Sequence, residues 1–346
     1  MISQVIDERS IRRLHDLLDD ASKIAVTCHQ GPDGDAIGSS LAAMHVLTAL
    51  GKDVKVIIPD PSLTQLRKLP GAKEIVDASR YPDFARKLLD DADLIICLDF
   101  NVPTRTGRLA DAILSANAPK VMIDHHLDPG DFAAVTISHP EMAATCVLLF
   151  RVLCRLELFN FIDKAAAECL LAGILTDTGN LSYNVGDPEL FTIVAELVRK
   201  GVDKEALTRR LFMTTSASSM RLNAYALLKK MELFADDHAA LIVLSREELN
   251  RFHYSKGDTE GLVNKPLEIP GIVYSCFLRE ETDLIKVSMR SVGSFPVNAI
   301  CADHFGGGGH LNAAGGEFYG SLDQCAELFR SILKDNSQKY KQHLNK

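Results

Sequence analysis

The sequence lacks the features that would place the protein in a membrane or in an oxidising compartment. It has no apolar run near the roughly 18 residues that a spanning helix needs, and residues 1–20 are amphipathic and acidic, unlike a signal peptide. Its eight cysteines form no CxxC pair, and several, such as Cys28 and Cys97, lie inside apolar runs where a free thiol packs as a small hydrophobe. We therefore expect no disulfide framework, no zinc–thiolate site, no membrane contact and a cytoplasmic location.

An excess of positive charge is also missing. The 38 Lys and Arg residues face 46 Asp and Glu residues, which gives a formal net charge of −8. A protein that grips long nucleic acid usually carries a basic face, because affinity comes from neutralising many phosphates. No GxxxxGK[ST] stretch occurs either, which excludes a P-loop. These absences predict that any phosphorylated substrate is small, and that cations offset the acidic side chains around it.

What is present is a chain of 346 residues, long enough for two domains. Its first half alternates short β-branched runs with helix-like stretches, which predicts an α/β fold with a doubly wound, mainly parallel sheet. We expect strands at 23–28, 53–58, 74–78, 93–99, 120–124 and 133–138. Helical patterns follow at 143–159, 164–177, 188–201 and 216–234, the last bridging the domains. Strands return at 239–245, 271–280 and 284–291, before a helix at 296–305 and a glycine run.

Acidic and imidazole side chains stand at the ends of four of these elements. The first cluster, His29, Asp33 and Asp35, follows the first strand in "TCHQGPDGDAIGSS", where glycine and proline allow a tight loop. Helix capping would explain Asp35 alone, and it leaves His29 and Asp33 unexplained. This loop therefore indicates a metal site.

The other three clusters each have an ordinary alternative as well. Asp99 ends a strand, where a simple turn residue is common, and Asp124-His125-His126 ends the strand "KVMID", where a polar turn is the alternative. Asp177 ends an apolar helix, although a helix C-terminus disfavours a carboxylate. Ligands bind at the carboxyl ends of strands in open parallel sheets, and three of the four clusters lie at such ends. Their shared location favours one ligand site over separate turn or capping residues.

Gathered together, these carboxylates would repel one another and some would have to protonate. Two divalent cations remove the conflict, and mixed Asp and His ligation suits manganese, with magnesium or zinc as alternatives. Two metals about 3.5–4 Å apart can share a bridging hydroxide and clamp a phosphoryl oxygen. The pattern therefore predicts a hydrolytic two-metal centre.

In order and context, the four motifs resemble those of the DHH phosphoesterase family. The stretch "DHFGGGGHLNAAGGEF" (303–318), with the preceding "VSMRS" (287–291), is similar to the family's DHH-associated C-terminal domain. The resemblance implies a catalytic domain at 1–190, a helical connector at 191–232 and a smaller α/β substrate-binding domain at 233–346. It places the active site in the cleft between the two domains.

The resemblance also implies two sets of metal ligands. One manganese would be held by His29, Asp33 and Asp99, and the other by Asp35, Asp99, His125 and Asp177, with Asp99 bridging. Asp124 would orient a ligand, and His126 would face the scissile phosphate as an electrophile or proton donor. Leu127 stands where the family usually has alanine, a departure that we expect to leave ligation intact.

In the C-terminal domain the glycine run would let backbone N–H groups cradle a phosphate or nucleotide. The residues implied in substrate binding are Arg290, Gly307, Gly308, Gly309 and His310. A flexible turn is the alternative for the glycines, but it does not account for the histidine directly behind them. For Arg105 and Arg108, near Asp99, the sequence does not decide between a solvated surface position and a role in the site.

Within the family, a compact acidic two-domain chain is most similar to the nanoRNase and pAp-phosphatase type. We therefore expect a manganese-dependent phosphoesterase that cuts very short oligoribonucleotides from the 3′ end and converts 3′-phosphoadenosine 5′-phosphate (pAp) to AMP. Its partners would be short oligoribonucleotides or small phosphonucleotides. A homodimer is left open, since the apolar segment 261–272 would either join the domains or form a dimer contact.

Three alternatives remain open at this point. The first is a phosphodiesterase for cyclic di-AMP or its linear product pApA, which would use the same motifs. The second is a nucleotide-sensing module that binds without cutting. Such a module would be expected to have lost at least one metal ligand, whereas every ligand position is filled here. The third is an aspartic protease, suggested by Asp-Thr-Gly at 177–179, which would need a second equivalent Asp and leaves the His motifs without a role.

Overall fold

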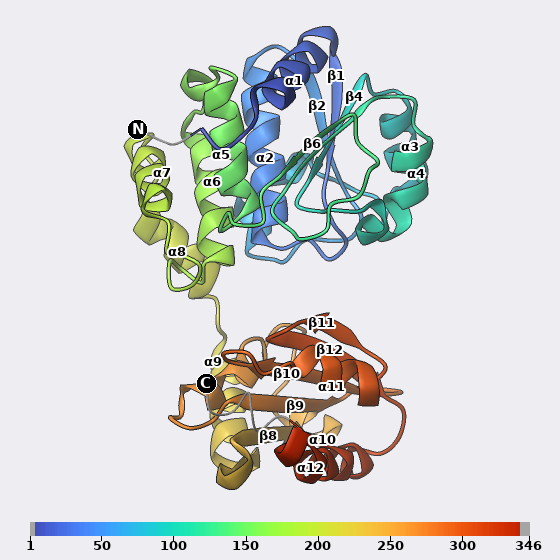
Figure 1. Cartoon of the computed structure of the whole chain (residues 1–346), viewed down its shortest axis with the longest axis vertical. Helices are drawn as coiled ribbons and strands as arrows, with labels where there is room; N and C mark the ends of the chain where they lie inside the picture. Colours follow the sequence, from blue (N-terminus) through green and yellow to red (C-terminus); the bar gives the residue numbers. More distant parts are fainter. Residues whose placement is uncertain (1–3, 340–346) are drawn as a thin grey trace. The chain divides into compact units, whose positions relative to one another are not determined.

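The computed structural model describes residues 4–339 and divides the chain into two compact units (Figure 1). These units are Met1–Thr214 and Thr215–Lys346, and each contains its own six-stranded sheet. The division between Thr214 and Thr215 falls inside the predicted helical connector, residues 191–232. We describe each unit by itself.

The first unit is built on a sheet in which every strand runs parallel to its neighbours. In spatial order the strands are β3 (Val76–Asp77), β2 (Asp53–Ile58), β1 (Lys23–Thr27), β4 (Leu94–Leu98), β5 (Lys120–Asp124) and β6 (Val135–Ser138). The central strand β4 is apolar and buried along its whole length, as expected of a sheet that is covered on both faces. The predicted doubly wound parallel sheet is confirmed, although β3 is only two residues long.

Helices cover both faces of this sheet (Figure 1). One face packs against α2, α5 and α6, and the opposite face packs against α3 and α4, while α1 lies along β6. The helices are α1 (Glu8–Asp20), α2 (Gly34–Ala49), α3 (Pro82–Asp90), α4 (Ala110–Ser115), α5 (Thr145–Arg155), α6 (Lys164–Asp177), α7 (Pro188–Arg199) and α8 (Lys204–Phe212).

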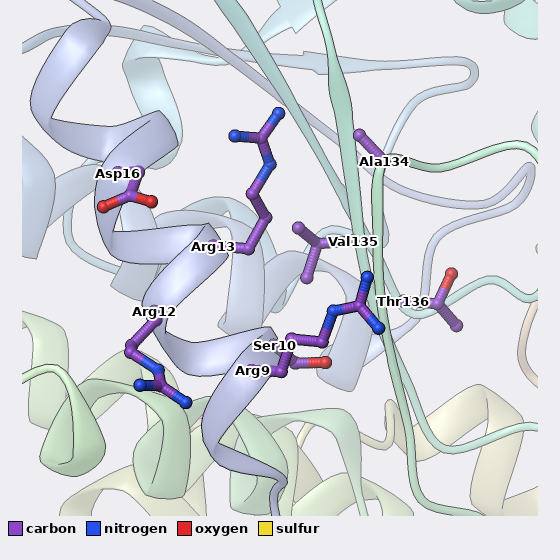
Figure 2. Close-up of a pocket in the computed structure, with 8 residues that line it drawn as sticks. All are labelled: Arg9, Ser10, Arg12, Arg13, Asp16, Ala134, Val135 and Thr136. Carbon is purple, nitrogen blue, oxygen red and sulfur yellow. The ribbon is translucent and has the colours of Figure 1, made fainter.

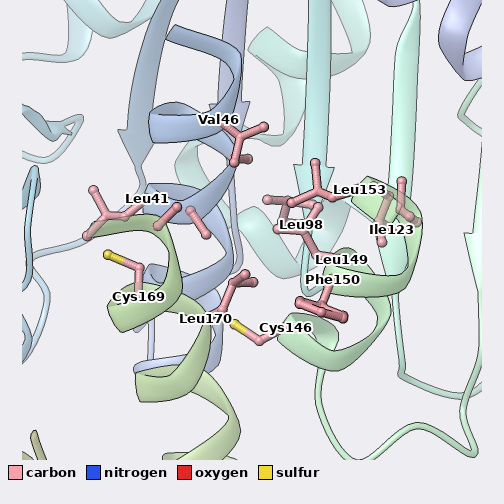
Figure 3. Close-up of a cluster of buried hydrophobic side chains, with 14 of the residues drawn as sticks. Leu41, Val46, Leu98, Ile123, Cys146, Leu149, Phe150, Leu153, Cys169 and Leu170 are labelled. Carbon is pink, nitrogen blue, oxygen red and sulfur yellow. The ribbon is translucent and has the colours of Figure 1, made fainter. Parts of the chain in front are cut away.

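The core between the sheet and α2, α5 and α6 fixes the end of the sheet at which the polar clusters lie (Figure 3). Leu98 and Ile123, which come directly before two of those clusters, are buried there against Leu149 and Leu153 of α5. Burying one such leucine or isoleucine side chain stabilises the fold by about 1.5–3 kcal/mol. The strand ends are therefore held by packed hydrophobic side chains.

Glycines let α2 and α6 approach closely. A Cβ on Gly38 would lie 2.5 Å from the carbonyl oxygen of Cys169, and one on Gly173 would lie 2.7 Å from a carboxylate oxygen of Asp35. Both distances are shorter than real Cβ contacts, so these positions require glycine. The close approach brings Asp35, at the start of α2, beside the end of α6.

The second unit has a mixed sheet. In spatial order its strands are β11 (Gly308–His310), β12 (Ala313–Phe318), β10 (Ile285–Ser291), β9 (Tyr274–Glu280), β8 (Ala239–Leu244) and β7 (Met231–Phe234). Among the described strands of this unit, only β8 and β9 pair in parallel. The helices of this unit are α9 (Ala217–Tyr225), α10 (Arg246–Arg251), α11 (Val297–His304) and α12 (Leu322–Lys339).

One sequence-based expectation for this unit is wrong. Residues 231–234, expected to end the helix 216–234, leave it through a π turn at Ala226–Lys230 and form β7, which pairs with β8. Pairing with a neighbouring strand here overrides local helix propensity. Within the glycine run, Gly308–His310 forms the edge strand β11.

The apolar segment 261–272 belongs to the interior of the second unit. Leu262 and Val263 are buried in one cluster with Leu222, Ile242 and Phe277 of the same unit. Their apolar surface is therefore covered within that unit.

All eight cysteines are free thiols, and only Cys154 is partly exposed. Among the described residues, no helix combines the length and apolar character that crossing a bilayer requires.

Candidate metal centre

The structure brings all the predicted ligand residues to one end of the first sheet. His29, Asp33 and Asp35 follow β1 into the start of α2, Asp99 follows β4, and His125 follows β5. Asp177 is the last residue of α6 and reaches the same edge. The parallel sheet aligns its strand ends at one edge, and the α2–α6 contact adds the helix end.

His29, Asp33 and Asp99 form the first group of potential ligands. The Nε2 atom of His29 lies 3.7 Å from Oδ1 of Asp33 and 3.5 Å from Oδ2 of Asp99. Its Nδ1 atom is bonded to the carbonyl oxygen of Gln30 at 2.9 Å, so Nδ1 carries the proton and Nε2 is free to coordinate. Three such donor atoms within 4.8 Å of one another can enclose a single ion.

Asp35, His125 and Asp177 form the second group. The Nε2 atom of His125 lies 3.9 Å from Oδ2 of Asp35 and 3.4 Å from Oδ2 of Asp177. Its Nδ1 atom donates to the carbonyl oxygen of Met142 at 3.0 Å, which again leaves Nε2 free. Both histidines are therefore held in the same tautomer by a backbone carbonyl.

Asp99 joins the two groups. Its Oδ2 faces His29, whereas its Oδ1 lies 3.6 Å from Nε2 of His125. The residue is almost fully buried and has a φ of 63°, a left-handed conformation that Asp tolerates better than most residues. Backbone strain of this kind costs about 1–3 kcal/mol and clusters at functional sites. One carboxylate is thus positioned to serve two ions.

The electrostatics of the centre also favour cations. Burial and the charge of Asp99 raise the pKa of Asp35 well above its usual range. Burial and the neighbouring carboxylates raise the pKa of Asp177 to about 10. Burial opposes a charge on His29, but Asp33 and Asp99 outweigh it and raise the pKa of His29 to about 10. Protons therefore neutralise the cluster where divalent cations would otherwise do so.

Asp124 and His126 form a pair beside these ligands. Asp124 is fully buried, and its Oδ1 accepts a hydrogen bond from Nδ1 of His126 at 2.7 Å. Its Oδ2 accepts from the backbone N–H of His126 at 3.0 Å. The imidazole is thereby fixed, with Nδ1 engaged and Nε2 left for another partner.

Comparison with known proteins agrees with this geometry. Residues 23–174 match the DHH family, N-terminal domain, and residues 239–338 match the DHHA1 domain. The bifunctional oligoribonuclease and PAP phosphatase NrnA of Thermus thermophilus is 33% identical over 314 residues, which are 90% of this chain and 89% of that protein. The chain belongs to the DHH family.

Two further relatives of this DHH protein are informative. A crystal structure of an exopolyphosphatase-related protein from Bacteroides fragilis matches it over 100% of both chains, with 45% identity and a TM-score of 0.96. The cyclic-di-AMP phosphodiesterase PdeA of Listeria monocytogenes is 24% identical over 87% of this chain, but only 45% of that protein is covered. The family resemblance seen in the motifs is confirmed.

The donor set of this DHH protein fits divalent metal ions. It consists of imidazole nitrogens and carboxylate oxygens without thiolates, the mixture that suits manganese, magnesium or zinc. The donor atoms already face one another. A cation that binds between them would displace the protons that the raised pKa values keep on these ligands.

Sequence reasoning missed the residues that hold Asp35 in place. The backbone N–H groups of Thr145 and Cys146, at the start of α5, donate to the two carboxylate oxygens of Asp35 at 2.5 and 2.9 Å. The hydroxyl of Thr145 donates to Oδ1 of Asp99 at 2.9 Å. The N-terminal end of a helix favours carboxylates. The stretch "AATC" before an apolar helix was the only local signal of this arrangement.

In the second unit, Arg290 and His310 occupy one row of the sheet. Both are in register with Ala313, Arg290 across β10–β12 and His310 across β11–β12, so their side chains share a face. A Cβ on Gly307 or Gly309 would clash with the backbone of β12, whereas Gly308 has open space around it. Two of the three predicted glycines are therefore required for the approach of β11 to β12.

Arg105 and Arg108 lie on the loop that follows Asp99, in its 3₁₀-helical part Pro103–Leu109. The carbonyl oxygen of Arg105 accepts from the N–H of Gln30 at 2.7 Å, which ties this loop to the residue after His29. The side chain of Arg108 lies 3.5 Å from Asp60 and is half exposed. The backbone of this segment thus supports the site, and Arg108 pairs at the surface.

Proposed function

We propose that this DHH protein is a phosphoesterase that removes mononucleotides from the 3′ end of very short oligoribonucleotides and converts pAp to AMP. The observation that carries the proposal is the pair of ligand groups joined by Asp99. The Thermus relative, named for both activities, supports it because the match spans nearly all of both chains.

Two divalent cations, manganese in the first instance and magnesium as the alternative, would occupy the two groups. His29, Asp33 and Asp99 would hold one, and Asp35, Asp99, His125 and Asp177 the other. Such ions supply Lewis-acid polarisation of a phosphoryl oxygen and lower the pKa of an attacking water.

The chain's own residues orient the substrate and move protons. His126 keeps Nδ1–H on Asp124, so its Nε2 is available to stabilise a phosphoryl oxygen or to protonate the leaving oxygen. Thr145 and the start of α5 hold Asp35 and Asp99 against their mutual repulsion. Orientation of the substrate and proton transfer both depend on strand ends that buried side chains such as Leu98 and Ile123 hold in place.

The second unit would bind the rest of the substrate. The Arg290 guanidinium suits a bidentate grip on phosphate, and His310 lies on the same face of the sheet. Gly307, Gly308 and Gly309 would offer backbone N–H groups to a phosphate or nucleotide. A binding site of fixed size limits substrate length, in keeping with small partners and a net charge of −8.

A cyclic di-AMP or pApA phosphodiesterase is the second candidate, favoured by the match to PdeA over 87% of this chain. It uses the same chemistry on another small dinucleotide. Buried free thiols fit a reducing compartment in either case, so we place the activity in the cytoplasm.

Product analysis separates these functions. The purified protein with manganese would be given pAp, pApA, cyclic di-AMP and a short RNA series, beside the Asp124→Ala, His125→Ala double variant. We expect cleavage of pAp and of two- to five-nucleotide RNA, and an inactive variant. A preference for cyclic di-AMP would move the function to the second candidate, and no manganese-dependent hydrolysis of any substrate would leave only nucleotide binding.

A further inference from the structure

A small cavity lies beside the second group of metal ligands. Its volume is about 310 Å³, and Met142 and Asn184 are among the residues that line it. Because the carbonyl oxygen of Met142 accepts from Nδ1 of His125, this wall of the cavity is one contact away from a ligand. The larger groove between α1 and β6, of about 580 Å³, is lined by none of the ligand residues (Figure 2). The segment that leads from Asp177 to Asn184 therefore begins and ends beside the metal centre.

The backbone of this segment has an unusual conformation. Gly179, Asn180 and Leu181 have φ values of 53°, 58° and 65°, which makes three left-handed residues in succession. A leucine rarely adopts such a φ. Strain of this kind persists only where the surrounding structure fixes it, and it clusters at active sites and ligand-binding sites. The turn is therefore a candidate for a role beyond the connection of α6 to α7.

Thr178, which directly follows the ligand Asp177, fixes the turn. It is fully buried, and its hydroxyl accepts a hydrogen bond from the N–H of Leu181 at 3.0 Å. Its carbonyl oxygen accepts from the N–H groups of Ser182 and Tyr183 at 2.7 and 2.9 Å. The backbone of Tyr183 is thus tied by a hydrogen bond to the residue next to a metal ligand.

Tyr183 is the aromatic side chain that this turn presents. It is 69% exposed, and within residues 4–339 its hydroxyl has no hydrogen-bond partner. Its ring packs against Gly179, where an added Cβ would lie 2.6 Å from Cδ2 of the tyrosine. This contact and the positive φ together require glycine at position 179. The ring is therefore held against the backbone and still open to solvent.

An exposed aromatic ring that is held beside a phosphate-binding centre suits a nucleobase. Bases stack on tyrosine rings, and such stacking tolerates any base because every base has a π-face. A nucleotide joins its base to its phosphate through a single ribose. Gly179, on which the ring of Tyr183 rests, is two residues from Asp177 and so lies within about 7 Å of it along the chain. A nucleotide with its phosphate at the metal centre can therefore place its base on this ring.

We propose that Tyr183 is a specificity-determining residue, which stacks on the base of the nucleotide whose phosphate lies at the metal centre. This inference rests on the proposed function, because it takes the substrate to be a nucleotide, and it adds how the base is recognised. The contact is with the face of the base and not with its edge, so purines and pyrimidines are both accepted. Tyr183 contributes binding, and the chemistry stays with the metal centre.

Equilibrium binding of mononucleotides tests the stacking contact. Calorimetry on the full chain with manganese would compare AMP and UMP with ribose 5-phosphate, which lacks a base, for the parent, Tyr183→Ala and Tyr183→Phe. We expect Tyr183→Ala to raise the dissociation constants of AMP and UMP about tenfold or more, the usual effect of losing a stacked aromatic ring. Its dissociation constant for ribose 5-phosphate should stay unchanged. Tyr183→Phe keeps the ring and should bind all three compounds like the parent.

Tyr81→Ala is the matched control, because Tyr81 is 61% exposed and lies at the start of α3, which carries none of the ligand residues. It should change none of the dissociation constants. A parent that binds AMP no better than ribose 5-phosphate would overturn the proposal, as would a Tyr183→Ala variant that keeps the preference for AMP. Equal weakening of ribose 5-phosphate in that variant would also overturn it, by showing a general disturbance of the site.

Hydrolysis of pAp by the parent tests the proposed function separately. A parent that cuts no substrate, but prefers AMP to ribose 5-phosphate only while Tyr183 is present, would overturn the proposed reaction and support the stacking contact. A parent that cuts pAp, with a Tyr183→Ala variant that binds AMP equally well, would support the reaction and overturn the stacking contact.

Discussion

Asp99 combines the two properties on which the centre depends. Its backbone is left-handed, and its two carboxylate oxygens face different histidines. The sequence indicated an acidic residue at the end of a strand, but not this backbone conformation. Aspartate tolerates a positive φ better than most residues, but no local pattern shows which aspartate adopts one.

Asp99→Asn separates ligation from folding. Asparagine tolerates the same φ and keeps an oxygen that can accept from Thr145, but it removes the charge that both ions would share. We expect kcat on pAp to fall about a thousandfold, since losing such a ligand costs several kcal/mol. The unfolding temperature without metal should not fall, because one of the repelling carboxylates is gone. Activity within about tenfold of the parent would rule out a bridging role.

His126→Ala tests the proton-handling imidazole. We expect kcat to fall about a hundredfold or more, the usual size of general acid–base effects, with manganese affinity close to that of the parent. His139→Ala is the matched control, because His139 pairs with Glu141 outside the ligand groups. Equal effects of the two substitutions would contradict the role given to His126.

At the scale of elements, the sequence predicted the parallel sheet well and the glycine-rich end poorly. The central strand β4 of the first unit is a continuous apolar run, so its burial can be predicted from its composition. The strand β11 is made of glycine and histidine, and it exists only because β12 lies beside it. Thr145 is similar, because its backbone N–H holds a carboxylate, Asp35, that is far away in the sequence. Such long-range partners leave no local trace.

The glycine run offers a matched pair of substitutions. Gly307→Ala should separate β11 from β12 and raise KM for short RNA, because its Cβ would clash with Gly315 and Gly316. Gly308→Ala has open space and should keep the strand pairing, so its effect reports contact with substrate alone. Steady-state kinetics on pAp and short RNA would measure both. Unchanged KM for Gly307→Ala would show that this edge takes no part in binding.

At the scale of the whole molecule, metal and proton binding are linked to stability. The pKa values of His29 and Asp177 are both raised to about 10 in the metal-free fold. The raised pKa of His29 contributes stability below its unfolded pKa of about 6.5, and this is lost as pH rises through 10. The raised pKa of Asp177 means that the fold keeps a proton that the unfolded chain releases, so its burial costs more as pH rises.

Both effects have the same sign, so the metal-free protein should be less stable at about pH 8.5 than at about pH 6.5. The lowered pKa of Asp33 adds no slope there, because that group is ionised in both states. Divalent cations displace the protons, so the stabilisation by magnesium should grow over the same interval. Thermal unfolding with chelator and with magnesium at both pH values measures this. A metal-free unfolding temperature that rises with pH would contradict the account.

The most direct single measurement is a crystal structure of the protein soaked in manganese, with anomalous scattering recorded at the manganese edge. We predict two anomalous peaks about 3.5–4 Å apart, one contacted by His29 and Asp33, the other by His125 and Asp177, with Asp99 between them. A single peak, or two peaks that do not share Asp99, would contradict the two-metal centre on which the proposed chemistry rests.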